Sequence, residues 1–213
     1  MYLPSHFAWT DRADQLAFCR ANSFATIVHD GPDGPEAQHV PLLADDVDGR
    51  LVLHGHVAIG DPLWKAAKAL AIFTGPHAYI SSAWYAVPDM PPTWNYLAVH
   101  AAGTLTPITD APTIAKLFAR LADIDPERAV WQAQMSPAGY VKLNAGLRWF
   151  RINADHVTAK AKLSQNHPAD RREKAIARLL ASADPHDQAT GRAMRRSLDG
   201  LPPWGGGAPA SPR

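Results

Sequence analysis

The sequence predicts a β-rich α+β fold in which an antiparallel sheet or barrel carries peripheral helices. The first reason is a meander, because three short strand-forming segments separated by turn residues follow one another between residues 24 and 56. The second is the segment 94–103, which is rich in aromatic and aliphatic residues and ends in a glycine. The third is 147–152, where apolar and polar residues alternate with the period of two that is typical of a strand.

The first half of the chain alternates between helix signals and strand signals. A helix is expected over 11–21, because Asp11 can cap it and its apolar residues recur at helical spacing. Pro41 interrupts the second strand, which indicates an edge strand, a bulge or backbone opened towards a ligand. The other elements expected here are strands over 24–29, 38–43, 51–56, 70–74 and 77–82, turns over 30–35 and 45–50, and a helix over 61–68 capped by Asp61.

The second half of the chain contains more helix. A helix over 110–122 is expected, with Asp110 as its cap and an apolar stripe along one face. Residues 199–213 are dominated by proline and glycine, which predicts a flexible tail after a single domain over 1–198. The other expected elements are short helices over 127–134 and 137–143, a strand over 147–152 that is extended or repeated by 157–162, and helices over 169–183 and 185–198.

Composition limits the class of protein. The 213 residues, of which 46% are hydrophobic, suffice to form one large domain with a core. A formal net charge of +1 argues against a large surface for binding polyanions. The single cysteine, Cys19, excludes an intrachain disulfide, so it is interpreted as a small buried hydrophobic residue of a cytoplasmic protein. No apolar run is long enough to span a membrane, and residues 1–5 lack the character of a signal peptide.

The strand that begins at Trp94 carries two aromatic rings, an amide and an imidazole within seven residues. Side chains alternate between the two faces of a strand, so Trp94, Tyr96 and His100 share one face while Asn95 and Leu97 share the other. A core face backed by a dimer contact and a face that binds a ligand both fit these residue types.

Two further clusters carry polar chemistry. The two imidazoles of His54-Gly55-His56 could bind a metal, but spacing fixes no third ligand, so the glycine is better explained by close approach of another group to the backbone. The helix start at Asp61 offers N–H groups to a phosphate, although a capped connecting helix is the simpler explanation. The segment 160–166 holds two lysines, a hydroxyl and two amides, which suit a phosphate and the polar edge of a ring or form a solvated loop.

Several short motifs follow one another along the chain in a fixed order. They are Met1-Tyr2-Leu3-Pro4 with His6-Phe7, Asn22-Ser23-Phe24-Ala25-Thr26, His39-Val40-Pro41-Leu42-Leu43, Gly55-His56-Val57-Ala58, Gly75-Pro76-His77-Ala78-Tyr79-Ile80-Ser81, Pro92-Thr93-Trp94-Asn95-Tyr96 with Val99-His100-Ala101, and Lys162-Leu163-Ser164-Gln165-Asn166. In this order and at these intervals they resemble the PaiB family of FMN-binding negative transcriptional regulators. The resemblance extends from Met1 to about Met194.

The resemblance implies a split β-barrel, similar to that of pyridoxamine-phosphate oxidases, that works as a homodimer with FMN at the subunit interface. Strand residues would lie along the isoalloxazine, the segment at Trp94 would close the site, and Lys65, or Lys162 with Ser164, would offset the phosphate charge. The cofactor-binding residues expected on this basis are His39, Val40, Pro41, Leu42, His54, Gly55, His56, Lys65, Trp94, Asn95, Tyr96, Lys162, Ser164, Gln165 and Asn166.

Three classes of function remain open at this point. A regulator would bind DNA or a protein partner, and only the late arginines, Arg192, Arg195 and Arg196, favour DNA over a solvated helix face. An FMN-dependent oxidoreductase would use NAD(P)H, because a flavin supplies its own hydride chemistry. A haem-binding split barrel would use a histidine as iron ligand. No catalytic residue and no metal ligand is expected from the spacing of the residues.

Overall fold

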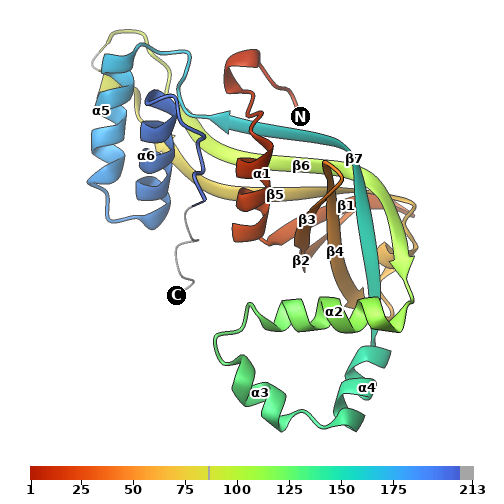
Figure 1. Ribbon diagram of the computed structural model, residues 1–213. Helices are drawn as coiled ribbons and strands as arrows, with labels where there is room; N and C mark the ends of the chain where they lie inside the picture. Colours follow the sequence, from red (N-terminus) through yellow and green to blue (C-terminus); the bar gives the residue numbers. More distant parts are fainter. Residues whose placement is uncertain (86, 207–213) are drawn as a thin grey trace. The chain divides into compact units, whose positions relative to one another are not determined.

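The computed structural model describes residues 1–85 and 87–206. Within them, seven strands form one antiparallel sheet in the order β2-β1-β5-β6-β7-β4-β3 (Figure 1). The strands are β1 (Phe24–Gly31), β2 (Gly34–Pro41), β3 (Leu43–Val47), β4 (Arg50–Ala58), β5 (Lys68–Ile80), β6 (Thr93–Ile108) and β7 (Leu147–Lys162). The helices are α1 (Arg12–Ala21), α2 (Ala111–Ala122), α3 (Arg128–Gln134), α4 (Pro137–Ala145), α5 (Ala169–Leu180) and α6 (Pro185–Leu198), with short 3-10 turns η1 (Ser5–Phe7), η2 (Pro62–Lys65) and η3 (Ser82–Tyr85).

The two edge strands of the sheet, β2 and β3, are joined through Leu42 alone. The Leu42 N–H donates to the Ser23 carbonyl at 2.8 Å, and the Leu42 side chain is buried. The sequence predicts one strand over 38–43, which is wrong, because Pro41 ends β2 and the chain then crosses to the other edge of the sheet. A passage from one edge to the other brings the sheet towards closure, as in a barrel.

The long strand β5 also differs from expectation. The sequence predicts two strands separated by Gly75-Pro76, whereas β5 runs through both residues. A Cβ atom at Gly75 would lie 2.4 Å from the ring of Phe18, so the glycine serves close packing rather than a turn. The helix predicted over 61–68 is only the turn η2, because Lys68 already begins β5.

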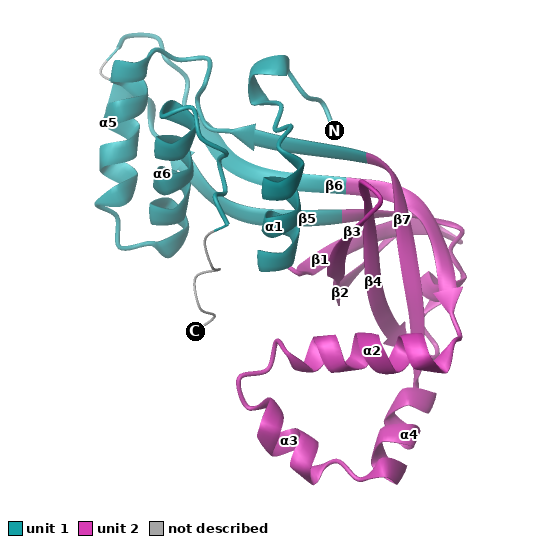
Figure 2. Cartoon of the chain, viewed as in Figure 1, with its two compact units in different colours: residues 1–22, 72–100, 157–213 teal, residues 23–71, 101–156 magenta. Residues whose placement is uncertain are grey.

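The chain divides into two compact units, coloured in Figure 2. Unit 1 comprises residues 1–22, 72–100 and 157–213, and unit 2 comprises residues 23–71 and 101–156. Strands β5, β6 and β7 each pass from one unit into the other. Each unit has buried apolar side chains of its own, which include Phe18, Phe73, Leu97 and Leu179 in unit 1 and Ile27, Leu53, Phe150 and Ile152 in unit 2.

Helix starts agree well with the sequence. The side chains of Asp11 and Asp110 accept hydrogen bonds from backbone N–H groups in the first turns of α1 and α2, as their capping roles predict. Cys19 is buried in α1, as the sequence predicts, and burial raises the pKa of its thiol to about 12. Among the described residues, no helix is both long and apolar enough to span a lipid bilayer.

Part of the tail predicted over 199–213 is packed. The Trp204 ring lies 5.2 Å from the Phe18 ring in an edge-to-face contact. The backbone N–H groups of Trp204 and Gly205 donate to the two carboxylate oxygens of Asp14 at 2.9 and 2.6 Å. Composition therefore underestimated the order of the segment up to Gly205, whereas residues 207–213 lie outside the described residues.

Candidate functional site

The first group of predicted site residues lies in unit 1, on and beside β6. Its side chains alternate as the sequence predicts, since Leu97 and Val99 are buried while Trp94 is 53% exposed. The Trp94 ring lies beside two other exposed rings, at 5.9 Å from His77 and 5.8 Å from Tyr79, both on β5. The outward face of β6 is thus an aromatic surface rather than part of the unit 1 core.

We call His77, Tyr79, Trp94 and His186 the aromatic patch. The His186 ring, on α6, lies 4.8 Å from the His77 ring, so that two strands and a helix contribute to the patch. Exposed rings in mutual contact offer a stacking surface to a planar aromatic ligand. The sequence identified only Trp94 among them. The alternation of exposed rings with buried residues along 77–80 is the signal that could have found the two on β5.

Lys162 supports the strand segment that carries Trp94. Its Nζ donates to the Thr93 hydroxyl and, at 2.7 Å, to the Trp94 carbonyl. Burial and the neighbouring Lys160 lower the pKa of Lys162. An ammonium group has three N–H donors, and these two bonds leave the third for a ligand. Lys162, expected beside the phosphate, thus lies next to the Trp94 segment within unit 1.

Asn95 and Ser164 are enclosed in the interior of unit 1. Asn95 is 0% exposed, and its Nδ2 donates to the Ser164 hydroxyl at 2.9 Å and contacts the Met194 sulfur at 3.3 Å. The Ser164 hydroxyl also lies 3.1 Å from the buried Tyr85 hydroxyl. These side chains satisfy one another, so they position β6 and the turn after β7 and have no surface for a ligand.

The remaining predicted residues of unit 1 differ in exposure. Tyr96 faces Lys160, whose Nζ lies 5.7 Å from its ring and donates to the Tyr2 carbonyl at 3.0 Å. Gln165 closes its own turn, because its amide bonds the Ala161 carbonyl and the Leu163 N–H at 2.6 and 2.7 Å. Asn166 is exposed. Of these side chains, that of Asn166 is the one most open to a ligand.

The second group of predicted site residues lies in unit 2, where His54 belongs to a charged cluster. Its Nδ1 is 3.4 Å from a carboxylate oxygen of Asp45, and Arg120 binds both oxygens of the same carboxylate at 2.7 and 2.8 Å. Burial lowers the pKa of His54, against the opposing effect of Asp45. The lowered pKa favours the uncharged imidazole, and the arginine already neutralises the carboxylate.

The His56 ring contacts that of Trp149, its partner in the β4–β7 pairing, with ring centroids 4.7 Å apart and planes tilted by 42°. Burial lowers the pKa of His56, and its buried Nδ1 has no hydrogen-bond partner among the described residues. Between the two histidines, a Cβ at Gly55 would lie 2.7 Å from Leu42 and 2.8 Å from Phe150. The glycine thus admits side chains of the core, and the close approach predicted at this position is internal to unit 2.

The other predicted residues of unit 2 are divided between core and surface. Val40 and Leu42 are buried, Pro41 is half-buried at the end of β2, and Lys65 is exposed on η2. His39 is exposed, and its Nδ1 lies 3.2 Å from the Thr26 hydroxyl. Within the described residues, no three His, Cys, Asp or Glu side chains gather closely enough to hold a metal ion.

The amino-acid sequence is similar to that of one protein family and of one bacterial protein. A family described as "Putative FMN-binding domain" matches residues 1–156. The protein of Bacillus subtilis named "Protease synthase and sporulation protein PAI 2" is 32% identical over 205 residues, which cover 93% of this chain and 98% of that protein.

Two solved structures resemble the fold. The flavocytochrome Anf3 of Azotobacter vinelandii superposes with a TM-score of 0.58 at 13% identity, covering 75% of this chain and 72% of that one. The FAD and haem binding protein of Mycobacterium smegmatis gives 0.50 at 18% identity, covering 78% and 77%. At such identities the likeness concerns the fold alone, and the predicted antiparallel split barrel with peripheral helices is confirmed.

Proposed function

The chain belongs to the PaiB family of FMN-binding domains, and on this premise we propose that it is an FMN-binding homodimer that acts as a negative transcriptional regulator. One observation carries the cofactor part of the proposal, namely the exposed aromatic patch beside Lys162. The dimer and the regulatory role rest on the resemblance to the family.

The aromatic patch fits the flat ring system of a flavin. Trp94 presents more than half of its surface to solvent, and Tyr79 is 48% exposed beside it. A tricyclic isoalloxazine stacked on Trp94 would gain the apolar burial that the free protein leaves unused. In this proposal Trp94 holds the ring and His77 and Tyr79 set its orientation.

The phosphate requires a cation or several N–H donors. Lys162 retains one N–H beyond its bonds to Thr93 and Trp94, and we assign it to the phosphate. In unit 2, His56 is the alternative contact: its buried Nδ1 has no hydrogen-bond partner among the described residues, and it would have to become accessible to meet a polar ligand edge. Bound FMN would supply hydride-transfer chemistry, and the protein residues would bind and orient it.

The test is a titration of the apoprotein with FMN, followed by quenching of flavin fluorescence. Trp94→Ala should weaken binding at least about tenfold, since one stacked aromatic contributes on the order of 1 kcal/mol beyond its buried area. Trp131→Ala, a tryptophan of α3 outside the patch, is the control and should bind as the wild type does. Unchanged affinity in Trp94→Ala would exclude the patch, and a loss confined to His56→Phe would transfer the site to unit 2.

The dimer is tested separately by sedimentation at micromolar concentration. A particle of about twice the 23.1 kDa chain mass is expected. A monomer that still binds FMN would remove the shared-interface part of the proposal and leave the cofactor assignment intact.

Two other functions compete with regulation. A visible spectrum distinguishes flavin from haem, and bleaching of a flavin by NADH or NADPH would favour an oxidoreductase. Regulation by DNA contact would depend on the arginines of α6, and two of them already have partners within the chain. Arg195 pairs with Glu173, and Arg196 Nε donates to the Pro202 carbonyl at 2.7 Å. Among those three arginines, this leaves Arg192, exposed on α6, as the side chain to replace in a DNA-binding assay.

A further inference from the structure

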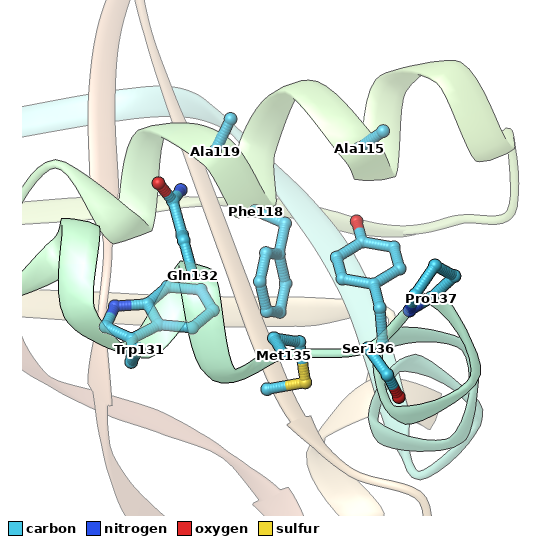
Figure 3. Close-up of a pocket in the computed structure, with 9 residues that line it drawn as sticks. Ala115, Phe118, Ala119, Trp131, Gln132, Met135, Ser136 and Pro137 are labelled. Atoms are coloured by element: carbon cyan, nitrogen blue, oxygen red, sulfur yellow. The ribbon is translucent and has the colours of Figure 1, made fainter.

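Helices α2, α3 and α4 of unit 2 line an open pocket of about 300 Å³ (Figure 3). Figure 3 shows the Phe118 ring pointing from α2 towards Trp131 and Met135. Ala115 and Ala119 leave room along α2, because their side chains are single methyl groups. The pocket is lined by Ala115, Phe118, Ala119, Trp131, Gln132, Met135, Ser136, Pro137 and Tyr140.

The lining determines the chemistry of a ligand. The Phe118 ring meets Trp131 edge-on at 5.9 Å and Tyr140 edge-on at 4.8 Å, so aromatic faces dominate the walls. None of the nine lining residues is charged. Polar groups are supplied by the Gln132 amide and the Ser136 hydroxyl, whose oxygen accepts from the Gly139 N–H at 3.0 Å while its hydrogen remains available.

The pocket helices have little other packing. No residue of α3 or α4 is buried, although Val130 and Val141 are apolar and more than half exposed. Short helices gain most of their stability from packing an apolar face. A ligand between α2 and the two shorter helices would supply such packing.

We propose that this pocket binds a small neutral aromatic molecule of one or two rings that carries a hydroxyl or carbonyl group. Its volume lies at the lower end of the range for ligand pockets, which suits one or two rings. The absence of charge from its lining disfavours a phosphate-bearing ligand such as FMN, so this site is distinct from the proposed cofactor site.

The pocket is connected to the sheet of unit 2. The Trp149 ring lies 6.3 Å from the Phe118 ring and 4.7 Å from the His56 ring. The Trp149 indole N–H donates to the Asn144 side chain of α4 at 2.9 Å. A ligand that moves Phe118 or α4 therefore changes the surroundings of His56, whose Nδ1 is otherwise unpartnered in the described structure.

The probe for this site is 1-naphthol, titrated into the full-length apoprotein by isothermal calorimetry. Saturable binding is expected, with affinity at least about tenfold weaker in Ala119→Leu, because added methyl groups fill the pocket. The matched control is Ala133→Leu, the same change at an exposed residue of α3 outside the lining, and it should bind as the wild type does. Trp131→Ala provides a second variant and should also weaken binding.

Several results would overturn the proposal. They are absence of binding by the wild type, equal weakening in the two leucine variants, and competition between FMN and 1-naphthol. A change of sedimenting mass in Ala119→Leu would mean that a second copy of the chain covers the pocket instead. If Trp94→Ala fails to bind FMN but still binds 1-naphthol, the pocket of α2, α3 and α4 is intact. The two proposals can therefore fail independently.

Discussion

Helices α5 and α6 bury an apolar stripe in unit 1, whereas α3 and α4 bury none of their residues in unit 2. On the first pair, Ile176 and Leu179 of α5 and Met194 of α6 are fully enclosed. The two helices lie side by side in Figure 1, and a Cβ at Gly191 would be 3.1 Å from that of Leu179. On the second pair, Val130 and Val141 face solvent.

This difference in burial indicates that the two pairs of helices have different roles. In α5 and α6 the apolar residues maintain the interior of unit 1, so substitutions there act on stability. In α3 and α4 the apolar residues are either exposed or, as for Trp131 and Tyr140, line a pocket, so substitutions there should leave unfolding nearly unchanged and those in the lining should act on binding. A pair of matched leucines tests this contrast on the helices themselves. A pair of asparagines and a histidine extend it to other elements of the two units, in order of falling effect.

The largest effect is expected for Leu179→Ala compared with Leu143→Ala. Leu179 is 0% exposed on α5, and its truncation should lower the free energy of unfolding by about 2–5 kcal/mol. Leu143 is 41% exposed on α4, and its truncation should change that energy by no more than about 0.5 kcal/mol. Urea unfolding of both variants gives the comparison, and equal losses would show that α4 is packed in solution.

A smaller effect is expected for Asn95→Leu compared with Asn144→Leu. The first change removes the amide partner of the buried Ser164 hydroxyl, which keeps only its contact with the Tyr85 hydroxyl, and should cost about 1–3 kcal/mol. The second releases the Trp149 indole N–H at a half-exposed site, where solvent can replace the amide, and should cost about 0.5–1.5 kcal/mol. Thermal melts of the apo forms measure both values.

FMN titration adds a second readout for the asparagine pair. Asn95→Leu should retain the FMN affinity of the wild type once it is folded, because the Asn95 side chain is inside unit 1. A loss of affinity without a loss of stability would return Asn95 to the cofactor site, as the sequence predicts.

The smallest effect concerns pH. Burial lowers the pKa of His56 below its ordinary value of 6.5, so the unfolded chain takes up this proton first as the pH falls. The contribution is fully present above pH 6.5 and is lost as the pH falls through the lower pKa of the folded state. Stability should decrease in that window by at most about 1.4 kcal/mol per pH unit for this group.

His56→Phe keeps a ring against Trp149 and removes the titration. Its unfolding energy, measured by urea at a series of pH values, should fall less steeply below pH 6.5 than that of the wild type. Parallel curves for the two proteins would mean that His56 is solvated in the folded state.

Local signals in the sequence predicted helices better than strand ends. The predicted capping aspartates mark the starts of α1 and α2, because a cap involves only neighbouring residues. The chain divides into β2 and β3 at Leu42 because β3 pairs at the far edge of the sheet. Strand β5 continues through Gly75 because the Phe18 ring packs closely against that glycine. No local pattern contains that information.

The candidate site was predicted in part for the same reason. Period-two alternation correctly separated the face of Trp94 from that of Asn95, but it did not say which face is buried. Both residues are expected at the cofactor site, but Trp94 is the accessible side chain, whereas Asn95 is buried and held by Ser164 and Met194. Replacing Trp94 is therefore the clean test of binding, and replacing Asn95 is a test of folding.

The contact between Asp14 and the end of the chain affects how the protein is made. Asp14 leaves the ribosome early, but the two N–H groups that it binds belong to Trp204 and Gly205, about 190 residues later. At about 5–20 residues per second, this delay is on the order of 10–40 s. All residues of unit 2 have been synthesised by His156, whereas unit 1 must wait for the last segment. A nascent chain can thus complete unit 2 while α1 still lacks its final partners.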